Sequence, residues 1–157
     1  MTAARLNKPV VRPPLVEEAT PVDRIDAAIL AFHEAYQSVI AGADQLLARK
    51  GLSRSHHKVL YHAARHPRCS VTEVREFIGV SRQAMQRPIN DLHGLGLIEI
   101  VASPANRKVH QLVLTDAGAT LERDVTSLVR QRFEEAFAKV DSGGVKNWLA
   151  VMRAFVG

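Results

Sequence analysis

The chain has 157 residues, of which 46% are hydrophobic and 24% charged, so it is long enough to fold as one domain with a buried core. No stretch approaches the roughly 18 consecutive apolar residues of a membrane span, and a single cysteine, Cys69, excludes an intramolecular disulfide. Residues 49–108 carry eleven basic and four acidic side chains, which gives this segment a net charge of +7. The whole chain has a net charge of +5, so the remaining residues together carry −2. A basic middle between mildly acidic flanks is typical of a module that binds a polyanion, although a solvated basic surface gives the same count.

Residues 1–21 are rich in proline and carry basic side chains. Because proline lacks the amide donor that a helix interior requires, we expect this segment to be a mobile basic arm. It contains no apolar run like the core of a secretory signal. Together with the lone cysteine, which suits a reducing compartment, this predicts a cytoplasmic location.

A long helix is predicted to follow. Asp23 is its candidate N-cap, apolar side chains then recur at spacings of three and four up to Leu47, and Gly51 ends it. A helix of roughly 25 residues is about 37 Å long, which exceeds what one core of this size covers. We therefore expect a partner chain to cover the excess.

The next helix is predicted to begin at Ser53 and to end before Pro67. Its inner face consists of Val59, Leu60 and Ala63. It also carries, on or beside it, four histidines: His56, His57, His62 and His66. His62 and His66 have the spacing of a zinc-binding pair, but no cluster of cysteine and histidine ligands accompanies them, so we expect exposed polar residues and no metal.

Two short helices joined by a glycine turn come next. Ser70 and Glu73 form a capping box, because the hydroxyl can accept from the Glu73 amide while the carboxylate accepts from the Ser70 amide. The predicted buried face of this first helix consists of Val74, Phe77 and Ile78. Gly79 supplies the left-handed residue that ends it, and Ser81 caps the second helix.

The second helix has two distinct faces. Met85, Ile89 and Leu92 point inward. The polar side chains that fall broadly opposite or on the flank are Arg82, Gln83, Gln86, Arg87 and Asn90. Glutamine and asparagine can bond an adenine edge at two points and arginine a guanine edge, so this face suits direct base readout, although ordinary surface helices are also polar.

Pro88 and Asp91 depart from a regular reading face. Proline in the seventh helical position removes the bond to the Ala84 carbonyl and predicts a kink. Asp91 is turned away from the Arg87 side, which predicts that it faces a neighbouring part of the protein.

A hairpin is predicted after this helix, between Leu97 and Leu114. Alternating or β-branched strand positions are Ile98, Ile100, Val109, Gln111 and Val113. Arg107 and Lys108 follow its turn, where they can reach DNA or can simply protect an edge strand by charge. A capped helix, a turn, a polar helix and a basic hairpin in this order predict a winged helix-turn-helix, whose second helix enters the DNA major groove.

Two more helices complete the predicted fold. Thr115 caps a long helix, Gly143-Gly144 breaks it, and residues 145–155 form a closing amphipathic segment. The fold class is therefore mainly α with a small β wing. We expect residues 22–157 to form one winged-helix domain, in which residues 53–115 are the DNA-binding lobe and residues 22–50 and 116–157 the dimerisation helices.

Between about Ser53 and Gly118 the sequence resembles the MarR family of bacterial transcriptional regulators, with the best matches in residues 73–82, 92–98 and 112–118. The resemblance implies a dimer held by the terminal helices and a small aromatic ligand, for which His33, Tyr36 and Tyr61 are candidate lining residues. Two departures lie in the DNA-reading parts. Asn106 replaces the acid that usually precedes the wing arginine, and Pro88 replaces an aliphatic residue.

The resulting hypothesis is a homodimeric, sequence-specific repressor that binds palindromic double-stranded DNA and is released by a small aromatic or phenol-like molecule. The residues expected to contact DNA are Ser81, Arg82, Gln83, Gln86, Arg87, Asn90, Asn106, Arg107 and Lys108. The alternatives are a winged-helix protein-interaction module and a redox- or metal-responsive regulator acting through Cys69 or the histidines. No nucleophile and base pair indicates an enzyme, and no cofactor is expected.

Overall fold

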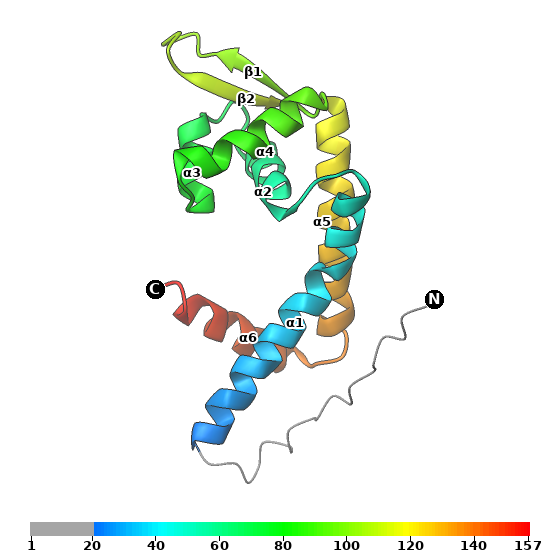
Figure 1. Ribbon diagram of the computed structural model, residues 1–157. Helices are drawn as coiled ribbons and strands as arrows, with labels where there is room; N and C mark the ends of the chain where they lie inside the picture. The colour runs from blue at the N-terminus through cyan, green and yellow to red at the C-terminus, as the bar shows by residue number, and fades with distance from the viewer. Residues whose placement is uncertain (1–20) are drawn as a thin grey trace, which may run out of the picture. The chain divides into compact units, whose positions relative to one another are not determined.

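The computed structural model describes residues 21–157 (Figure 1). Its elements are α1 (Pro21–Arg49), α2 (Arg54–Arg65), α3 (Val71–Ile78), α4 (Arg82–Gly94), β1 (Ile98–Ala102), β2 (His110–Leu114), α5 (Asp116–Phe137) and α6 (Ser142–Ala154). The chain divides into two units after Ser38, within α1. In the described part, none of these helices has the length and apolar character to cross a membrane. The predicted arm lies outside the described residues except for Pro21, which already belongs to α1.

The first unit contains the beginning of α1, and its start differs from the prediction. The helix has begun by Pro21, so Asp23 lies in the first turn and is not the cap. The apolar side chains of this part are exposed, with exposed fractions of 63% for Ile25, 62% for Ile29 and 59% for Phe32. This stretch of α1 therefore presents an uncovered apolar stripe.

The second unit holds the hydrophobic core. Ala43 and Leu47 from the end of α1 contribute to it, together with the predicted inner face of α2, where Val59 and Leu60 are fully buried. Gly51 has a φ of 70°, as expected for the residue that ends α1. Arg65 on α2 forms an ion pair of 2.9 Å with the buried carboxylate of Glu122 on α5.

The helix-turn-helix forms as the capping signals predict. Ser70 Oγ accepts from the Glu73 amide at 3.2 Å, and the Glu73 carboxylate accepts from the Ser70 amide at 2.6 Å. Hydrogen bonding of the Glu73 carboxylate to the backbone amide and the side chain of Ser70 lowers the pKa of Glu73. Gly79 ends α3 with a φ of 75°. The prediction for Phe77 was wrong, because this side chain is 52% exposed and stacks on the outside against the ring of Tyr61.

Strands β1 and β2 form the antiparallel wing, in which Ile98 pairs with Leu114 and Ile100 with Leu112. Ile98 and Leu112 are the fully buried residues of the two strands. Leu112 therefore marks the inward face of β2, and Gln111 and Val113 lie on its other face. The Leu112 amide donates to the Cys69 carbonyl at 2.8 Å, which ties the wing to the start of α3. The wing and the two short helices are thereby parts of one packed lobe.

The junction between the wing and α5 is tightly packed. Thr115 caps α5, since its Oγ1 accepts from the Gly118 amide at 3.1 Å. The same hydroxyl donates to the Gly96 carbonyl at 2.7 Å. Gly118 is buried so closely against the Leu97 carbonyl that a Cβ there would lie 1.9 Å from the oxygen.

The end of the chain differs from the prediction in where the helix breaks. α5 ends at Phe137, and Gly143-Gly144 lies in the first turn of α6, because Asp141 caps that helix by accepting from the Gly144 amide at 2.7 Å. An aromatic cluster of Phe133, Phe137 and Trp148 joins α5 to α6.

Candidate DNA-binding surface

Helix α4 presents the predicted polar face to solvent. Met85, Ile89 and Leu92 are buried at 2%, 5% and 0% exposure, so the helix is held by the opposite face. The predicted base-reading residues are all exposed: Arg82, Gln83, Gln86, Arg87 and Asn90. α4 continues through Pro88, whose ring is buried on the inward side. Proline therefore takes part in the packing of the helix and leaves the outer face unobstructed.

Ser81 has a structural role at the start of α4. Its hydroxyl accepts from the Ala84 amide at 3.2 Å, which satisfies one of the free donors of the first turn. The exposed hydroxyl is thus held at the end of the helix next to Arg82. The remaining free amides of this first turn give the end of α4 a partial positive charge, which favours a nearby phosphate.

The tip of the wing is shaped by Asn106. Its side-chain oxygen accepts from the Lys108 amide at 3.0 Å, and its carbonyl accepts from the Val109 amide at 2.9 Å. This is the local turn chemistry that an aspartate at the same position would also supply. Asn106 therefore orders the backbone beneath Arg107 and Lys108 without an ion pair.

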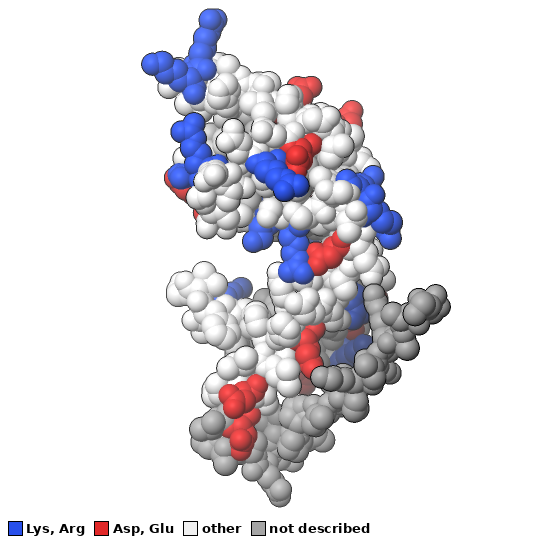
Figure 2. Space-filling model, in the orientation of Figure 1, with Lys and Arg blue, Asp and Glu red and all other residues white. Residues whose placement is uncertain are grey.

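Arg107 and Lys108 are exposed, and neither forms an ion pair with any of the described residues 23–157. Figure 2 shows Lys and Arg side chains projecting from the end of the wing. Two adjoining surface hollows, each of about 400 Å³, are lined by residues of α3, α4 and the wing. Arg82 and His110 line both of them, so this part of the surface joins α4 to the wing.

Two histidines of α2 are buried, contrary to the prediction that they are exposed. His56 has an exposed fraction of 6% and His62 of 8%. Burial lowers the pKa of His62, and neither ring nitrogen of His62 has a hydrogen-bond partner among the described residues. Their burial was missed because it depends on α3 and α4, which cover one side of α2, and not on the spacing within α2.

The residues expected to line a ligand site are divided between the two units. His33 and Tyr36 are exposed on the first unit, and Tyr61 is half-buried on α2. The Arg65 guanidinium lies 3.4 Å from the centre of the Tyr61 ring. Cys69 is buried, which raises the pKa of its thiol, and the described residues contain no group of three or more side chains that could hold a metal ion.

The fold and this surface define a winged helix-turn-helix protein. The sequence model of the MarR family matches residues 50–108, which span α2 to the tip of the wing. The HTH-type transcriptional regulator PetP of Rhodobacter capsulatus is 27% identical over 134 residues, covering 85% of this chain and 81% of PetP.

Solved structures show the same fold. The MarR family transcription regulator SP03579 has a TM-score of 0.75 at 17% identity, over 86% of this chain and 89% of that chain. A mutant of MarR from E. coli, in complex with operator DNA, has a TM-score of 0.68 at 16% identity, over 88% of this chain and all of that chain. The family-model match over residues 50–108 and the fold shared with these structures confirm the resemblance to the MarR family seen in the sequence.

Proposed function

We propose that the protein is a homodimeric repressor that binds a palindromic DNA site through α4 and the wing. The observation that carries the proposal is the exposed outer face of α4, at whose start Arg82 lines the same hollow as Lys108 of the wing. Glutamine, asparagine and arginine are the side chains that read adenine and guanine edges. The wing cations Arg107 and Lys108 then contact phosphate or the minor groove, as positioning contacts.

The uncovered apolar side chains support a dimer. In the first unit, Ile25, Ile29 and Phe32 are more than half exposed. In the second unit, Trp148 on α6 is 39% exposed and Phe155, which directly follows α6, is 79% exposed. Large exposed apolar groups on both terminal helices favour burial against a second copy of the chain. Two copies would supply two α4 helices for half-sites one DNA turn apart.

A small aromatic molecule is the proposed effector, and the cytoplasm, where bacterial DNA lies, is the proposed location. Tyr61 with the adjacent Arg65 guanidinium supports a contribution from α2, because such a pair suits an aromatic anion. His33 and Tyr36 remain proposed contributors from the first unit. Binding of the effector would release the protein from DNA if it favours a dimer geometry in which the two α4 helices no longer match the half-sites.

Two measurements on the full chain test this proposal. Sedimentation equilibrium is expected to give twice the monomer mass. Fluorescence anisotropy with duplexes of random sequence is expected to show an affinity that falls steeply as salt rises, because phosphate contacts release counterions. A monomer, or binding to DNA that is absent or insensitive to salt, contradicts the proposal and favours a protein-interaction module.

A further inference from the structure

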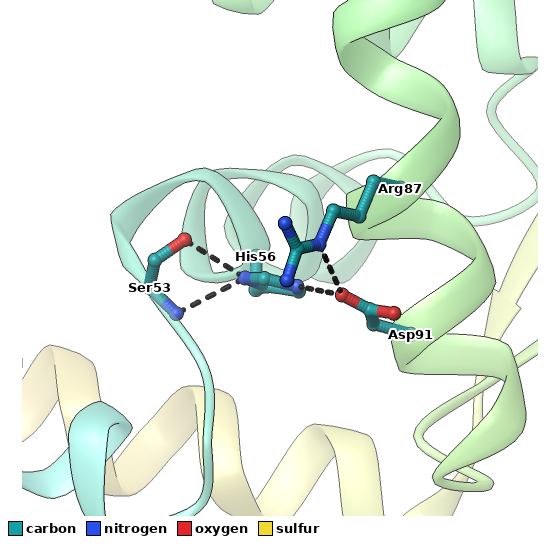
Figure 3. Close-up of polar contacts among 4 residues, drawn as sticks. All are labelled: Ser53, His56, Arg87 and Asp91. Carbon is teal, nitrogen blue, oxygen red and sulfur yellow. Dashed lines mark hydrogen bonds and ion pairs between the residues drawn. The ribbon is translucent and has the colours of Figure 1, made fainter.

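A chain of polar contacts connects the start of α2 to the exposed face of α4. His56 lies between Ser53 and Asp91, and Arg87 approaches Asp91 from the preceding turn of α4 (Figure 3). The His56 ring is buried, whereas 89% of the Arg87 side chain is exposed. The contacts therefore run from a buried group to a side chain that the proposed function places against DNA.

The contacts of His56 determine which ring nitrogen carries the proton. The Ser53 backbone amide, which can only donate, lies 3.0 Å from Nδ1. Nδ1 is therefore the acceptor, and the proton of the neutral ring lies on Nε2. That nitrogen is 3.1 Å from Oδ2 of Asp91, so His56 donates to the carboxylate. Because the ring is anchored at Nδ1 to the backbone, the position of this donor is defined.

Asp91 in turn faces one edge of the Arg87 guanidinium. Oδ2 of Asp91 lies 3.6 Å from Nε of Arg87, one helical turn away. Among the described residues, the two terminal nitrogens of the guanidinium have no ion-pair partner. These are the donors that a bidentate contact to a guanine edge uses. The expectation that Asp91 faces a neighbouring part of the protein is confirmed by its bond to His56. The expectation that it is turned away from Arg87 was wrong, because residues one helical turn apart can pair and these two do.

We propose that His56 is a positioning residue for DNA recognition, which acts through Asp91 to hold the Arg87 guanidinium in the orientation that reads a base. The inference rests on the proposed function. Without the His56 donor, the Asp91 carboxylate is free to turn toward solvent, and Arg87 loses its fixed ion-pair partner. Ordering the long Arg87 side chain would then occur on binding, which predicts an affinity lower by about three- to tenfold.

The test uses a duplex that the wild-type protein enriches from a random pool, with affinities measured for His56→Leu, Arg87→Ala and the double variant. We expect His56→Leu to weaken binding by about three- to tenfold in the wild-type background and to have no further effect once Arg87 is absent. His57→Leu is the matched control, because His57 is next in sequence but contacts Thr126 of α5 at 3.3 Å. It is expected to leave the affinity unchanged.

The Asp91→Asn variant distinguishes a role of Asp91 in positioning Arg87 from an effect of its negative charge on phosphate. If Asp91 only repels phosphate, its neutralisation strengthens binding, which overturns the proposal. If it positions Arg87, the variant binds more weakly and loses preference for the base that Arg87→Ala also fails to select. In the free protein, the NMR signal of the Arg87 Nε–H group is expected to move in His56→Leu and not in His57→Leu.

The outcomes distinguish the inference from the proposed function. If the wild type enriches no duplex, the proposed function fails. If Arg87→Ala weakens binding but the effects of His56→Leu and Arg87→Ala are additive, the proposed function stands and the positioning role is refuted. An unchanged Arg87 Nε–H signal in His56→Leu refutes it independently of any DNA.

Discussion

Substitution of Gly118 by alanine tests the packing that holds the wing against α5. The new Cβ would lie 1.9 Å from the Leu97 carbonyl oxygen, whereas contacts of real Cβ atoms under 3.0 Å essentially do not occur. The start of α5 must therefore move by about 1.1 Å relative to this carbonyl. The obstacle is a backbone atom, so rotation of a side chain cannot relieve the contact.

That movement breaks the hydrogen bonds of the junction. Thr115 donates its amide to the Leu97 carbonyl at 3.2 Å and its hydroxyl to the Gly96 carbonyl at 2.7 Å, and it accepts from the Gly118 amide at 3.1 Å. At about 1 kcal/mol for each bond, we expect Gly118→Ala to lower the free energy of unfolding by about 3 kcal/mol.

Urea unfolding followed by circular dichroism, at one fixed protein concentration, measures this change. Gly94→Ala is the control, because Gly94 ends α4 with no atom within 4 Å of the new Cβ. It is expected to leave stability unchanged or to raise it by up to about 1 kcal/mol through helix propensity. A Gly118→Ala variant within about 0.5 kcal/mol of the wild type would refute the packing argument.

Three further predictions concern DNA binding and pH. Arg87→Ala should lower affinity for a selected duplex by about 1–3 kcal/mol and relax the preference at one base, and an unchanged preference would remove Arg87 from base readout. Lys108→Ala should weaken binding to all sequences alike and reduce the salt slope by about 1 in anisotropy titrations, whereas sequence-selective loss would contradict a phosphate contact. Burial lowers the pKa of His62, so the unfolded chain binds more protons just below the ordinary histidine value, and stability falls as pH drops through that range. His62→Phe should flatten this dependence in urea unfolding between about pH 5 and 7, and an equal slope would contradict it.

Local signals in the sequence predicted the helix boundaries of the DNA-binding lobe. A capping residue bonds to backbone groups only a few positions away, so the local sequence alone indicates where a helix begins or ends. This holds for Ser70 with Glu73, for Gly79 and for Ser81. The prediction that Gly143-Gly144 breaks a helix was wrong, because it considered the two glycines without the cap that precedes them. Glycine weakens a helix, but Asp141 caps this one and compensates.

Burial in three dimensions could not be predicted in the same way. The period of α3 places Phe77 beside Val74, yet only Val74 meets the core, because nothing in the described residues covers the outer part of Phe77. His56 is polar and was expected to be exposed, but α4 brings Asp91 to it from 35 residues away. The composition of the α4 face was predictable, whereas the contact that orients Arg87 depends on how α2 and α4 pack.

In the proposed complex, two copies of the chain read a two-fold symmetric DNA site through α4. Enrichment of bound duplexes from a random pool, followed by sequencing, tests it most directly. We expect an inverted repeat whose half-site centres lie about one helical turn, or about 10 base pairs, apart. Enrichment of no motif, or of a motif without two-fold symmetry, would contradict it.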